Sequence, residues 1–592
     1  MDITPKILLQ NADLYGAESA LSVRDQEGNW HHTNWSDLYA EIMDISKALF
    51  ACGVGINDKV SIYSYNRKEW YAGYLAAQTI GGVAVGVYHT CSSQEVEWIV
   101  GNSDSKVVFV GDNPMDNGEK EKMPNHRILK ILDNLPQVET VVMMSGIEVL
   151  NHEKMISWED FIGRGKDISV NTVTDILDKL TLDHTACLIY TSGTTGNPKG
   201  VELTYKNWSF EIRVSNEIFK FNQGERYVSW LPLAHVFGQL IDVNYWVQNG
   251  LHLYICDSPL KVVDYAKEVQ PHLFIGVPRI YEKIYSNLKS AIDGKAILKY
   301  GLKIPGLSTL LKGKLKEAIG FTDARFLISG AAPINTDILH LFQSLDIPLF
   351  EGYGMTENAA AATANHGNAN KIGTVGQAIP ETEIKIAKDG EILMRGDHVM
   401  KGYYKNPEAT NETIIDGWLY TGDVGEIDDE GFLKITGRKK EIYVTSGGKN
   451  IAPLIIEETM KSISLLSQCF LVGDGRKYCS ALFTLDVSAI LRDKLGVDAN
   501  AIPKDPEGQI LMLNEKGHTL SDFTENEDIH SEIQDQVDVL NTRFSNPEQV
   551  KKFSILSRDL TIDDGELTPT LKIRRKQIRD NWDSVIESMY TE

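Results

Sequence analysis

The feature that most constrains the fold of this chain is an alternation between short apolar runs and longer helix-like segments. The runs are rich in β-branched residues and continue to about residue 437; examples are KVSIYSYN, KVVFVGD, ETVVMM, ACLIYT, HLYICD, HLFIGV and ARFLISG. Strands that alternate with helices are typical of α/β proteins with largely parallel sheets. Because 592 residues exceed what one core normally holds, we expect more than one domain.

The pattern changes near Gly437. The stretch GFLKITGRKKEIYVTSGGKNIAP indicates a strand, a charged turn, a second strand and a glycine loop. We expect a helix from Pro453, then two strands that meet in a hairpin at Asp474–Gly475, and a helical, acidic remainder. We therefore predict a large α/β domain at residues 1–437 and a smaller α+β domain at residues 438–592.

The sequence favours a soluble, cytoplasmic protein. Its N-terminal segment lacks the basic stretch and apolar core of a signal peptide. Residues 70–94 contain no Asp, Glu, Lys or Arg, but polar residues and a glycine pair divide them into pieces shorter than the roughly 20 residues that cross a bilayer. A buried helix, a glycine turn and a core strand explain them better. The six cysteines form no CxxC pair, and free thiols in a reducing compartment are expected.

The net charge of the chain disfavours nucleic acid as a partner, whereas one local basic stretch leaves contact with a membrane open. The chain has 59 Lys and Arg against 82 Asp and Glu, a net charge of −23, which disfavours broad binding to nucleic acid. Residues 289–317 depart from this average, with seven lysines, two acids and interleaved apolar residues. The ordinary interpretation is a pair of surface helices covered by lysines. The alternative is that Lys289–Lys316 makes a peripheral contact with the inner face of an anionic membrane.

A loop rich in glycine and hydroxyl residues, YTSGTTGNPKG at residues 190–200, follows a predicted buried strand. Glycines allow backbone N–H groups to approach a polyphosphate, hydroxyls donate hydrogen bonds, and Lys199 supplies charge. The spacing does not match the G-x-x-x-x-G-K-[ST] phosphate loop. On composition alone, a flexible turn of glycine and threonine explains the loop at least as well as a phosphate site.

The loop is the first of a series of motifs that occur in a fixed order. The others are LPLAHVFGQ (231–239), GVPRIYEK (276–283), SGAAP (329–333), EGYGMTE (351–357), YTGDVG (420–425), GRKKEIYVTSGGKNIAP (437–453) and GELTPTLKIRR (565–575). In this order they resemble the signatures of the adenylate-forming superfamily. The stretches GYYKNPEAT, GVYHTCSSQEVEWIV and GELTPTLKIRR are most similar to long-chain and bubblegum-type fatty acyl-CoA synthetases.

The resemblance implies a large domain of stacked, mostly parallel sheets with a small β subdomain, and the use of ATP, Mg²⁺ and coenzyme A. It implies that ATP phosphates are bound by Thr191, Ser192, Gly193, Thr194, Thr195 and Lys199. It places Mg²⁺ on Glu357, the α-phosphate near Thr356, and adenine against Tyr353. The nucleotide and acyl group would also contact Glu351, Gly352, Gly354, Gly330, Ala331 and Ala332.

Further roles follow from the same resemblance. Asp423 would accept hydrogen bonds from the ribose, supported by Arg438, and His235 would lie near the acyl carboxylate. Lys572 would contact the carboxylate and the α-phosphate; the Thr570-Leu571 pair before it replaces the more common Ser-Gly. The small domain would then rotate about Lys440 and present a loop formed by Gly447, Gly448 and Lys449 to the thiol substrate.

The resulting hypothesis is an AMP-forming long-chain fatty acid–CoA ligase. The alternatives are a ligase that loads a separate carrier protein, a CoA ligase for medium-chain or aryl acids, and a non-catalytic nucleotide- or lipid-binding protein. The presence of Lys199, Glu357, Asp423 and Lys572 disfavours the last of these. Neither the chain length of the acid nor the oligomeric state follows from the sequence.

Overall fold

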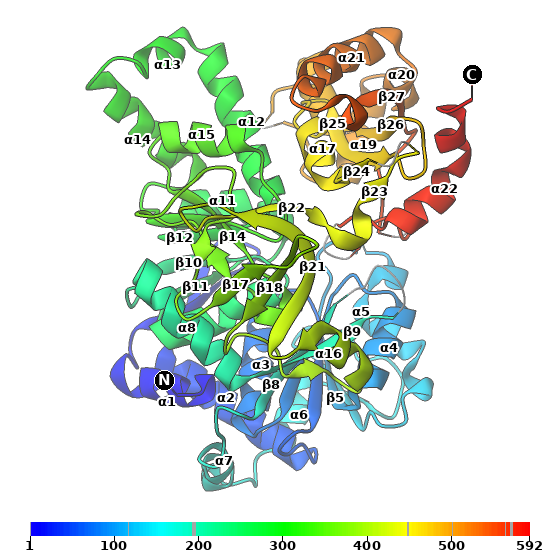
Figure 1. Ribbon diagram of the computed structural model, residues 1–592. Coiled ribbons are helices and arrows are strands. Elements are labelled where there is room, and N and C mark those ends of the chain that lie inside the picture. Colours follow the sequence, from blue (N-terminus) through cyan, green and yellow to red (C-terminus); the bar gives the residue numbers. More distant parts are fainter. Residues whose placement is uncertain are drawn as a thin grey trace.

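The computed structural model describes residues 2–116, 118–191, 197–446, 449–499, 501–562, 564–568 and 572–591. Figure 1 shows a large body that holds most of the chain and a smaller C-terminal lobe above one side of it. On the opposite side the body extends upward as a helical projection, formed by α12 (Pro278–Gly294), α13 (Ala296–Gly301) and α14 (Leu307–Ile319). The two upper parts face each other across a gap.

The first sheet of the body has, in the described part of the chain, the strand order β19-β9-β8-β4-β3-β5-β6-β7. Pairs from β8 through β7 are parallel, whereas β9 is antiparallel to both β8 and β19. The strands are β3 (Lys59–Tyr63), β4 (Val83–Val87), β5 (Ser105–Val110), β6 (Thr140–Met143), β7 (Met155–Ile156), β8 (Thr185–Thr191), β9 (Lys199–Thr204) and β19 (Gly402–Tyr403).

The second sheet has the order β16-β15-β14-β13-β12-β10-β11-β1-β2 among the residues described. Its middle, from β14 to β1, is parallel. The strands are β1 (Ser19–Arg24), β2 (Trp30–Asn34), β10 (Arg226–Ser229), β11 (His252–Ile255), β12 (Leu273–Gly276), β13 (Phe326–Ser329), β14 (Leu349–Tyr353), β15 (Thr363–Ala364) and β16 (Gln377–Ala378). The predicted α/β architecture with mostly parallel sheets is confirmed.

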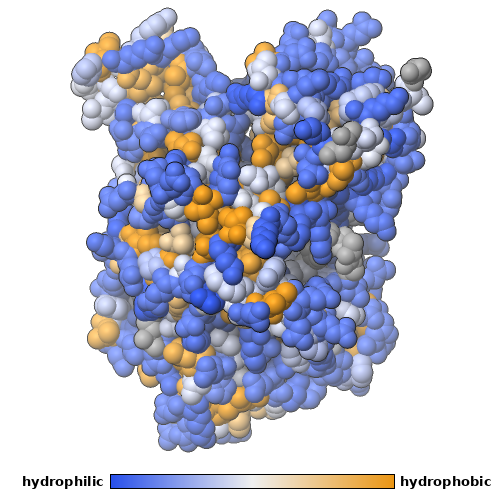
Figure 2. All heavy atoms as spheres, in the orientation of Figure 1, coloured by the Kyte–Doolittle hydropathy of each residue, from blue (hydrophilic) through white to orange (hydrophobic). Residues whose placement is uncertain are grey.

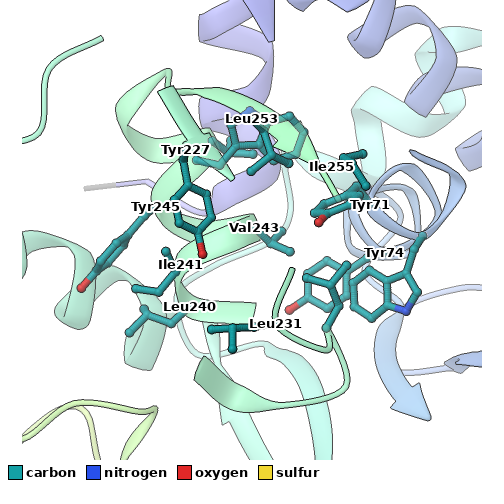
Figure 3. Close-up of a cluster of buried hydrophobic side chains, with 14 of the residues drawn as sticks. Tyr71, Tyr74, Tyr227, Leu231, Leu240, Ile241, Val243, Tyr245, Leu253 and Ile255 are labelled. Carbon is teal, nitrogen blue, oxygen red and sulfur yellow. The ribbon is translucent and has the colours of Figure 1, made fainter. Parts of the chain in front are cut away.

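Helices between and outside these sheets bury the core. In helix α3 (Lys68–Thr79), the residues from Trp70 to Thr79 are all buried. Figure 3 shows Tyr71 and Tyr74 of α3 facing Tyr227 of β10 and the π-helical turn η3 (Gln239–Tyr245). The other helices of the body include α1 (Thr4–Leu14), α2 (Trp35–Ala51), α4 (Ser93–Ser103), α6 (Trp158–Arg164), α7 (Val170–Leu177), α8 (Tyr205–Phe219), α11 (Val262–Val269), α15 (Thr336–Ser344) and α16 (Pro407–Thr413).

A small antiparallel β subdomain completes the body. Strand β21 pairs with β18, β20 and β22, and β17 pairs with β18. Its strands are β17 (Glu383–Ile386), β18 (Glu391–Arg395), β20 (Ile414–Ile415), β21 (Trp418–Ile427) and β22 (Leu433–Arg438). Strand β22 ends at the residue where the sequence changes character.

The C-terminal lobe has its own apolar clusters, which involve residues from Tyr443 onward. The expected helix from Pro453 is α17 (Pro453–Met460), and the expected hairpin joins β25 (Leu466–Val472) to β26 (Cys479–Leu485). The prediction that the remainder is helical was incomplete. Strand β27 (Val550–Ile555) pairs parallel with β26, and helices α19 (Pro506–Glu515), α21 (Glu527–Asn541) and α22 (Arg575–Ser588) surround this sheet.

Two expectations about membranes and thiols can be compared with this structure. Among the helices described, none combines the length and apolar character needed to cross a bilayer. Residues 70–94 form α3, a glycine turn and β4, as predicted. All six cysteines are free and buried.

Candidate active site

The candidate site is a cleft of about 3000 Å³ between the large body and the C-terminal lobe. Figure 2 shows its opening as a notch between the helical projection and the lobe. Residues from both parts line it, among them His235, Ala331, Arg438 and Lys572. Because both parts contribute, movement of the lobe would change the composition of the cleft.

The floor of the cleft lies at the carboxyl ends of parallel strands. Strands β12, β13 and β14 are neighbours in the sheet, and they end at Gly276, Ser329 and Tyr353. Ligands of open α/β sheets bind at such ends. Ala331, just after β13, adopts a left-handed backbone with φ of 68°. A side chain at Gly330 would press its Cβ against the Phe237 ring at 3.2 Å.

Glu357 lies in a short helical turn directly after β14 and is only 9% exposed. Its Oε1 accepts a 2.8 Å hydrogen bond from the Tyr403 hydroxyl, and its backbone oxygen accepts one from the Met400 N–H. The Lys199 ammonium lies 4.8 Å from the centre of the same Tyr403 ring. Tyr403 therefore connects the predicted phosphate lysine with the predicted metal ligand.

Asp423 receives hydrogen bonds on both carboxylate oxygens. Tyr353 donates its hydroxyl to Oδ2 at 2.6 Å, and Arg438 donates Nε–H to Oδ1 at 3.0 Å. Strand register explains the second contact, because Asp423 of β21 lies opposite Arg438 of β22. Each carboxylate oxygen has a second lone pair, so Asp423 can still accept bonds from a diol.

His235 caps the short helix α9 (Val236–Gly238), and its Nδ1 accepts the Phe237 N–H at 3.1 Å. Burial, and then the nearby Lys572 ammonium, lower the pKa of His235 to about 3. The ring is therefore neutral at pH 7, and because Nδ1 is an acceptor, its proton resides on Nε2. His235 can donate one hydrogen bond to an anionic oxygen.

Lys572 comes from the C-terminal lobe and reaches the same cleft. The surrounding protein displaces part of the water around its ammonium and so lowers its pKa, and Arg438 acts in the same direction, while Asp423 and Glu357 oppose them. The side chain stays accessible to solvent inside the cleft. A cation from the lobe thus lies among the body's acidic and basic site residues.

For the other predicted site residues, the structure shows fewer contacts that bear on their assigned roles. Ser192, Gly193, Thr194, Thr195, Gly447, Gly448, Thr570 and Leu571 lie outside the described residues. Thr191 ends β8 and pairs with Lys199. Lys440 is exposed and lines the cleft, whereas the described lining does not include Lys449. Glu351 is buried, which raises its pKa to about 8. Thr356 is buried beside Glu357, Gly352 lies in β14, Gly354 follows that strand, and Ala332 follows Ala331 after β13.

Sequence reasoning missed Tyr403 as a site residue. The stretch GYYKNPEAT was noted for its family resemblance, but a tyrosine beside a second tyrosine carries no signal of its own. The contact with Glu357 joins residues 46 positions apart. The antiparallel pairing of β19 with β9 brings Tyr403 next to Lys199.

The residues present fit ATP with Mg²⁺. Among the described residues, no cluster of three or more His, Cys, Asp or Glu could hold a metal ion. Mg²⁺ in nucleotide sites is commonly held by one or two carboxylates together with the phosphates and water. Glu357 Oε2 can supply such a ligand, since Oε1 is engaged by Tyr403. Lys199, Arg438 and Lys572 can balance the phosphate charge.

A family model described as "AMP-binding enzyme" matches residues 9–404. The chain belongs to this family. The long-chain-fatty-acid–CoA ligase FadD15 of Mycobacterium bovis is 31% identical, with 95% of this chain and 93% of that protein aligned. The long-chain-fatty-acid–CoA ligase ACSBG2 of Xenopus laevis is 30% identical over 99% of this chain and 83% of its own.

Solved structures with the same fold include the adenylation domain of a carboxylate reductase from Mycobacterium chelonae. Its TM-score is 0.76 at 18% identity, covering all of this chain and 91% of that one. The o-succinylbenzoate CoA synthetase of Bacillus subtilis, solved with its acyl-adenylate intermediate, has a TM-score of 0.67 at 21% identity, covering 97% and 98%. Because both alignments cover at least 97% of this chain, the similarity of fold includes its body and its C-terminal lobe.

Proposed function

We propose that this AMP-binding enzyme is a long-chain fatty acid–CoA ligase. It joins a fatty acid to ATP, forming acyl-AMP and pyrophosphate, and then transfers the acyl group to the thiol of coenzyme A with release of AMP. Two curated relatives, each aligned over at least 95% of this chain, are named for that activity. The observation that carries the proposal is that Lys572 lines the cleft together with His235 and lies close enough to Glu357 and Asp423 for their charges to raise its pKa.

In the first step, the fatty acid carboxylate attacks the α-phosphorus and the bond to pyrophosphate breaks. The acid is already ionised at pH 7, so no general base is required. The chain must hold two anions together, and Lys572 and the His235 Nε2–H are placed to neutralise the oxygens where charge accumulates. Lys199 and Glu357 would hold the phosphates and their Mg²⁺, which neutralises the departing pyrophosphate.

In the second step, the thiol must reach the acyl carbonyl of the adenylate. In the first step Lys572 lies beside this group and blocks the approach. We propose that the domain of residues 438–592 turns about Lys440 relative to residues 1–437, so that the chain beyond Lys440 moves and withdraws Lys572. The separate apolar clusters of the lobe support this division. The neighbouring Lys439 holds the segment to the body through Asp389 and Glu391, at 2.6 and 2.8 Å.

The test is pyrophosphate release by the purified chain with saturated acids from C2 to C24, with and without coenzyme A. We expect release that depends on long-chain acids, and acyl-CoA only when coenzyme A is present. Formation of acyl-AMP without acyl-CoA would favour the enzyme that loads a carrier protein. A preference for short or aryl acids would contradict the long-chain assignment.

We also propose that the enzyme works in the cytoplasm and touches a membrane through its helical projection. Ile297, Tyr300, Ile304 and Leu310 are 66%, 62%, 51% and 58% exposed there, and Figure 2 shows apolar surface on this projection. The same stretch, residues 289–316, contains seven lysines. Exposed apolar residues interspersed with lysines are typical of binding to anionic bilayers.

The membrane proposal can be tested by sedimentation with vesicles of phosphatidylcholine alone or with phosphatidylserine. We expect binding only to the anionic vesicles and its loss in Ile297→Asp/Tyr300→Asp. Leu511→Asp is the matched control, because Leu511 is 62% exposed but lies on α19 of the lobe. Equal binding by all three proteins would contradict the assigned surface.

A further inference from the structure

One ion pair joins the lobe to the body right beside the catalytic lysine. Arg574, two residues after Lys572, donates from Nη2 to Glu95 Oε1 at 3.1 Å. The two residues are 479 positions apart in the chain. Glu95 lies in α4, a helix that none of the sequence motifs of the large domain assigns to catalysis. The pair therefore fixes the lysine segment to a part of the cleft wall whose residues were not predicted as site residues.

The Glu95 side chain is held in place from its own side. It completes the capping box of α4, in which Oε2 accepts from the Ser92 N–H at 3.0 Å and from the Ser92 hydroxyl at 3.1 Å. The following residues Val96, Ile99 and Val100 are buried in the core beneath. The Glu95 carboxylate thus accepts hydrogen bonds from Ser92 on one oxygen and from Arg574 of the lobe on the other. The bonds to Ser92 orient the carboxylate independently of the lobe.

The lysine segment is also ordered from its own side. The Lys572 N–H donates to the Thr568 hydroxyl at 3.0 Å, and its carbonyl accepts from the Thr568 N–H at 2.8 Å. The Arg574 N–H donates to the Glu566 carbonyl at 2.7 Å. The Glu566 side chain is buried and bonds Arg558 and Trp582 within the lobe. Lys572 and Arg574 are thus tied to the same framework, and fixing one limits the position of the other.

We propose that Glu95 is a positioning residue for adenylate formation, which clamps Arg574 so that Lys572 points into the cleft. The inference rests on the role proposed above for Lys572. Glu95 does not touch the reacting atoms; it acts through Arg574. Rotation of the lobe breaks the pair, so the clamp operates in the first half-reaction and not in the second.

Other ion pairs between body and lobe supply a comparison. Arg279 donates to Asp486 at 3.0 Å, and Lys504 pairs with Asp264. These contacts join α12 and α11 to parts of the lobe that are distant in sequence from Lys572. Loss of either one leaves the segment that carries the lysine unaltered.

The experiment compares Glu95→Gln, Arg574→Gln and the double variant with Asp264→Asn as the control. Glu95→Gln keeps an amide oxygen for the Ser92 cap and removes the charge. Two rates are measured: pyrophosphate formation from fatty acid and ATP, and acyl-CoA formation from supplied acyl-adenylate. We expect each single variant to slow the first rate about fivefold, the upper range for a half-exposed ion pair, and to leave the second unchanged. The double variant should be no slower than either single one, and the control should be near wild type.

The outcomes separate the clamp from the role of Lys572. The clamp is overturned if Glu95→Gln leaves the first rate unchanged, if the losses add in the double variant, or if both rates fall together. Lys572→Ala is measured alongside. If it slows pyrophosphate formation while Glu95→Gln does not, only the clamp is wrong. If Lys572→Ala leaves that rate intact, the proposed role of the lysine fails and the clamp with it.

Discussion

The contact between Tyr403 and Glu357 gives the sharpest prediction about the first half-reaction. In Tyr403→Phe the hydroxyl that donates to Oε1 at 2.8 Å is removed, while the ring beneath the Lys199 ammonium remains. Glu357 is only 9% exposed, so water replaces the lost donor poorly. Hydrogen bonds to a charged group contribute about 1.5–3 kcal/mol, which corresponds to a slowing of roughly 10- to 150-fold.

Two further variants separate the hydroxyl from the ring. Tyr403→Leu also removes the cation–π contact with Lys199, and this should cost a further 0.5–1 kcal/mol, or about two- to fivefold. Tyr404→Phe is the matched control, because the neighbouring hydroxyl donates at 3.3 Å to Asp104 on the surface. It should retain wild-type activity.

The assay is fatty-acid-dependent exchange of pyrophosphate into ATP, measured across Mg²⁺ concentrations. We expect Tyr403→Phe to lower the exchange rate and to raise the Mg²⁺ concentration needed for half-maximal rate, since Glu357 is no longer oriented. The reasoning is refuted if Tyr403→Phe behaves like Tyr404→Phe. A loss confined to Tyr403→Leu would show that the ring, and not the hydroxyl, carries the effect.

Three other predictions concern the hinge and two buried groups. Lys440→Pro should block rotation, so acyl-adenylate should still form from acid and ATP while acyl-CoA formation falls at least tenfold; unchanged overall turnover would rule out Lys440 as the hinge. The pKa of His235 is lowered to about 3, so the ring stays neutral between pH 5 and 8 and should contribute no inflection near pH 6.5 to the rate of pyrophosphate formation. Comparison of wild type with His235→Asn over that range checks this, and an inflection lost in the variant would contradict it. Burial raises the pKa of Glu351 from 4.5 to about 8, so the folded state holds its proton more tightly than the unfolded state. Stability from this group is complete below pH 4.5 and declines as the pH rises toward 8. The melting temperature of Glu351→Gln should therefore fall less between pH 4.5 and pH 8 than that of the wild type. Parallel plots of melting temperature against pH would be evidence against a buried neutral carboxyl.

Much of the fold could be predicted because the strands of a parallel sheet are buried on both faces. Runs such as KVVFVGD and ACLIYT are almost continuously apolar, and they correspond to β5 and β8. Strand β27 was missed for the opposite reason. Its sequence VKKFSI has two exposed lysines, and it pairs on only one side with β26. An edge strand of this kind lacks the pattern that identifies a buried one.

Site residues that lie within a recognisable motif could be predicted from the sequence. Contacts between residues of different segments could not. Glu357, Asp423 and Lys572 were expected from the order of the signatures, and in the structure the charges of the two carboxylates act on the Lys572 ammonium. The Tyr403 bridge and the pair between Glu95 and Arg574 depend on how distant segments pack. No local pattern encodes either contact, because each partner is an ordinary residue in its own segment.

The pairing of Asp423 with Arg438 across β21 and β22 has a consequence for the intermediate. Arg438 is the last residue of β22, and the pivot proposed at Lys440 begins after it. The groups assigned to the adenine and ribose therefore remain with the body when the lobe turns. The acyl-adenylate, a mixed anhydride, would remain bound to the body while Lys572 leaves and the thiol approaches. Such retention would protect an easily hydrolysed compound from water during the interval between the two half-reactions.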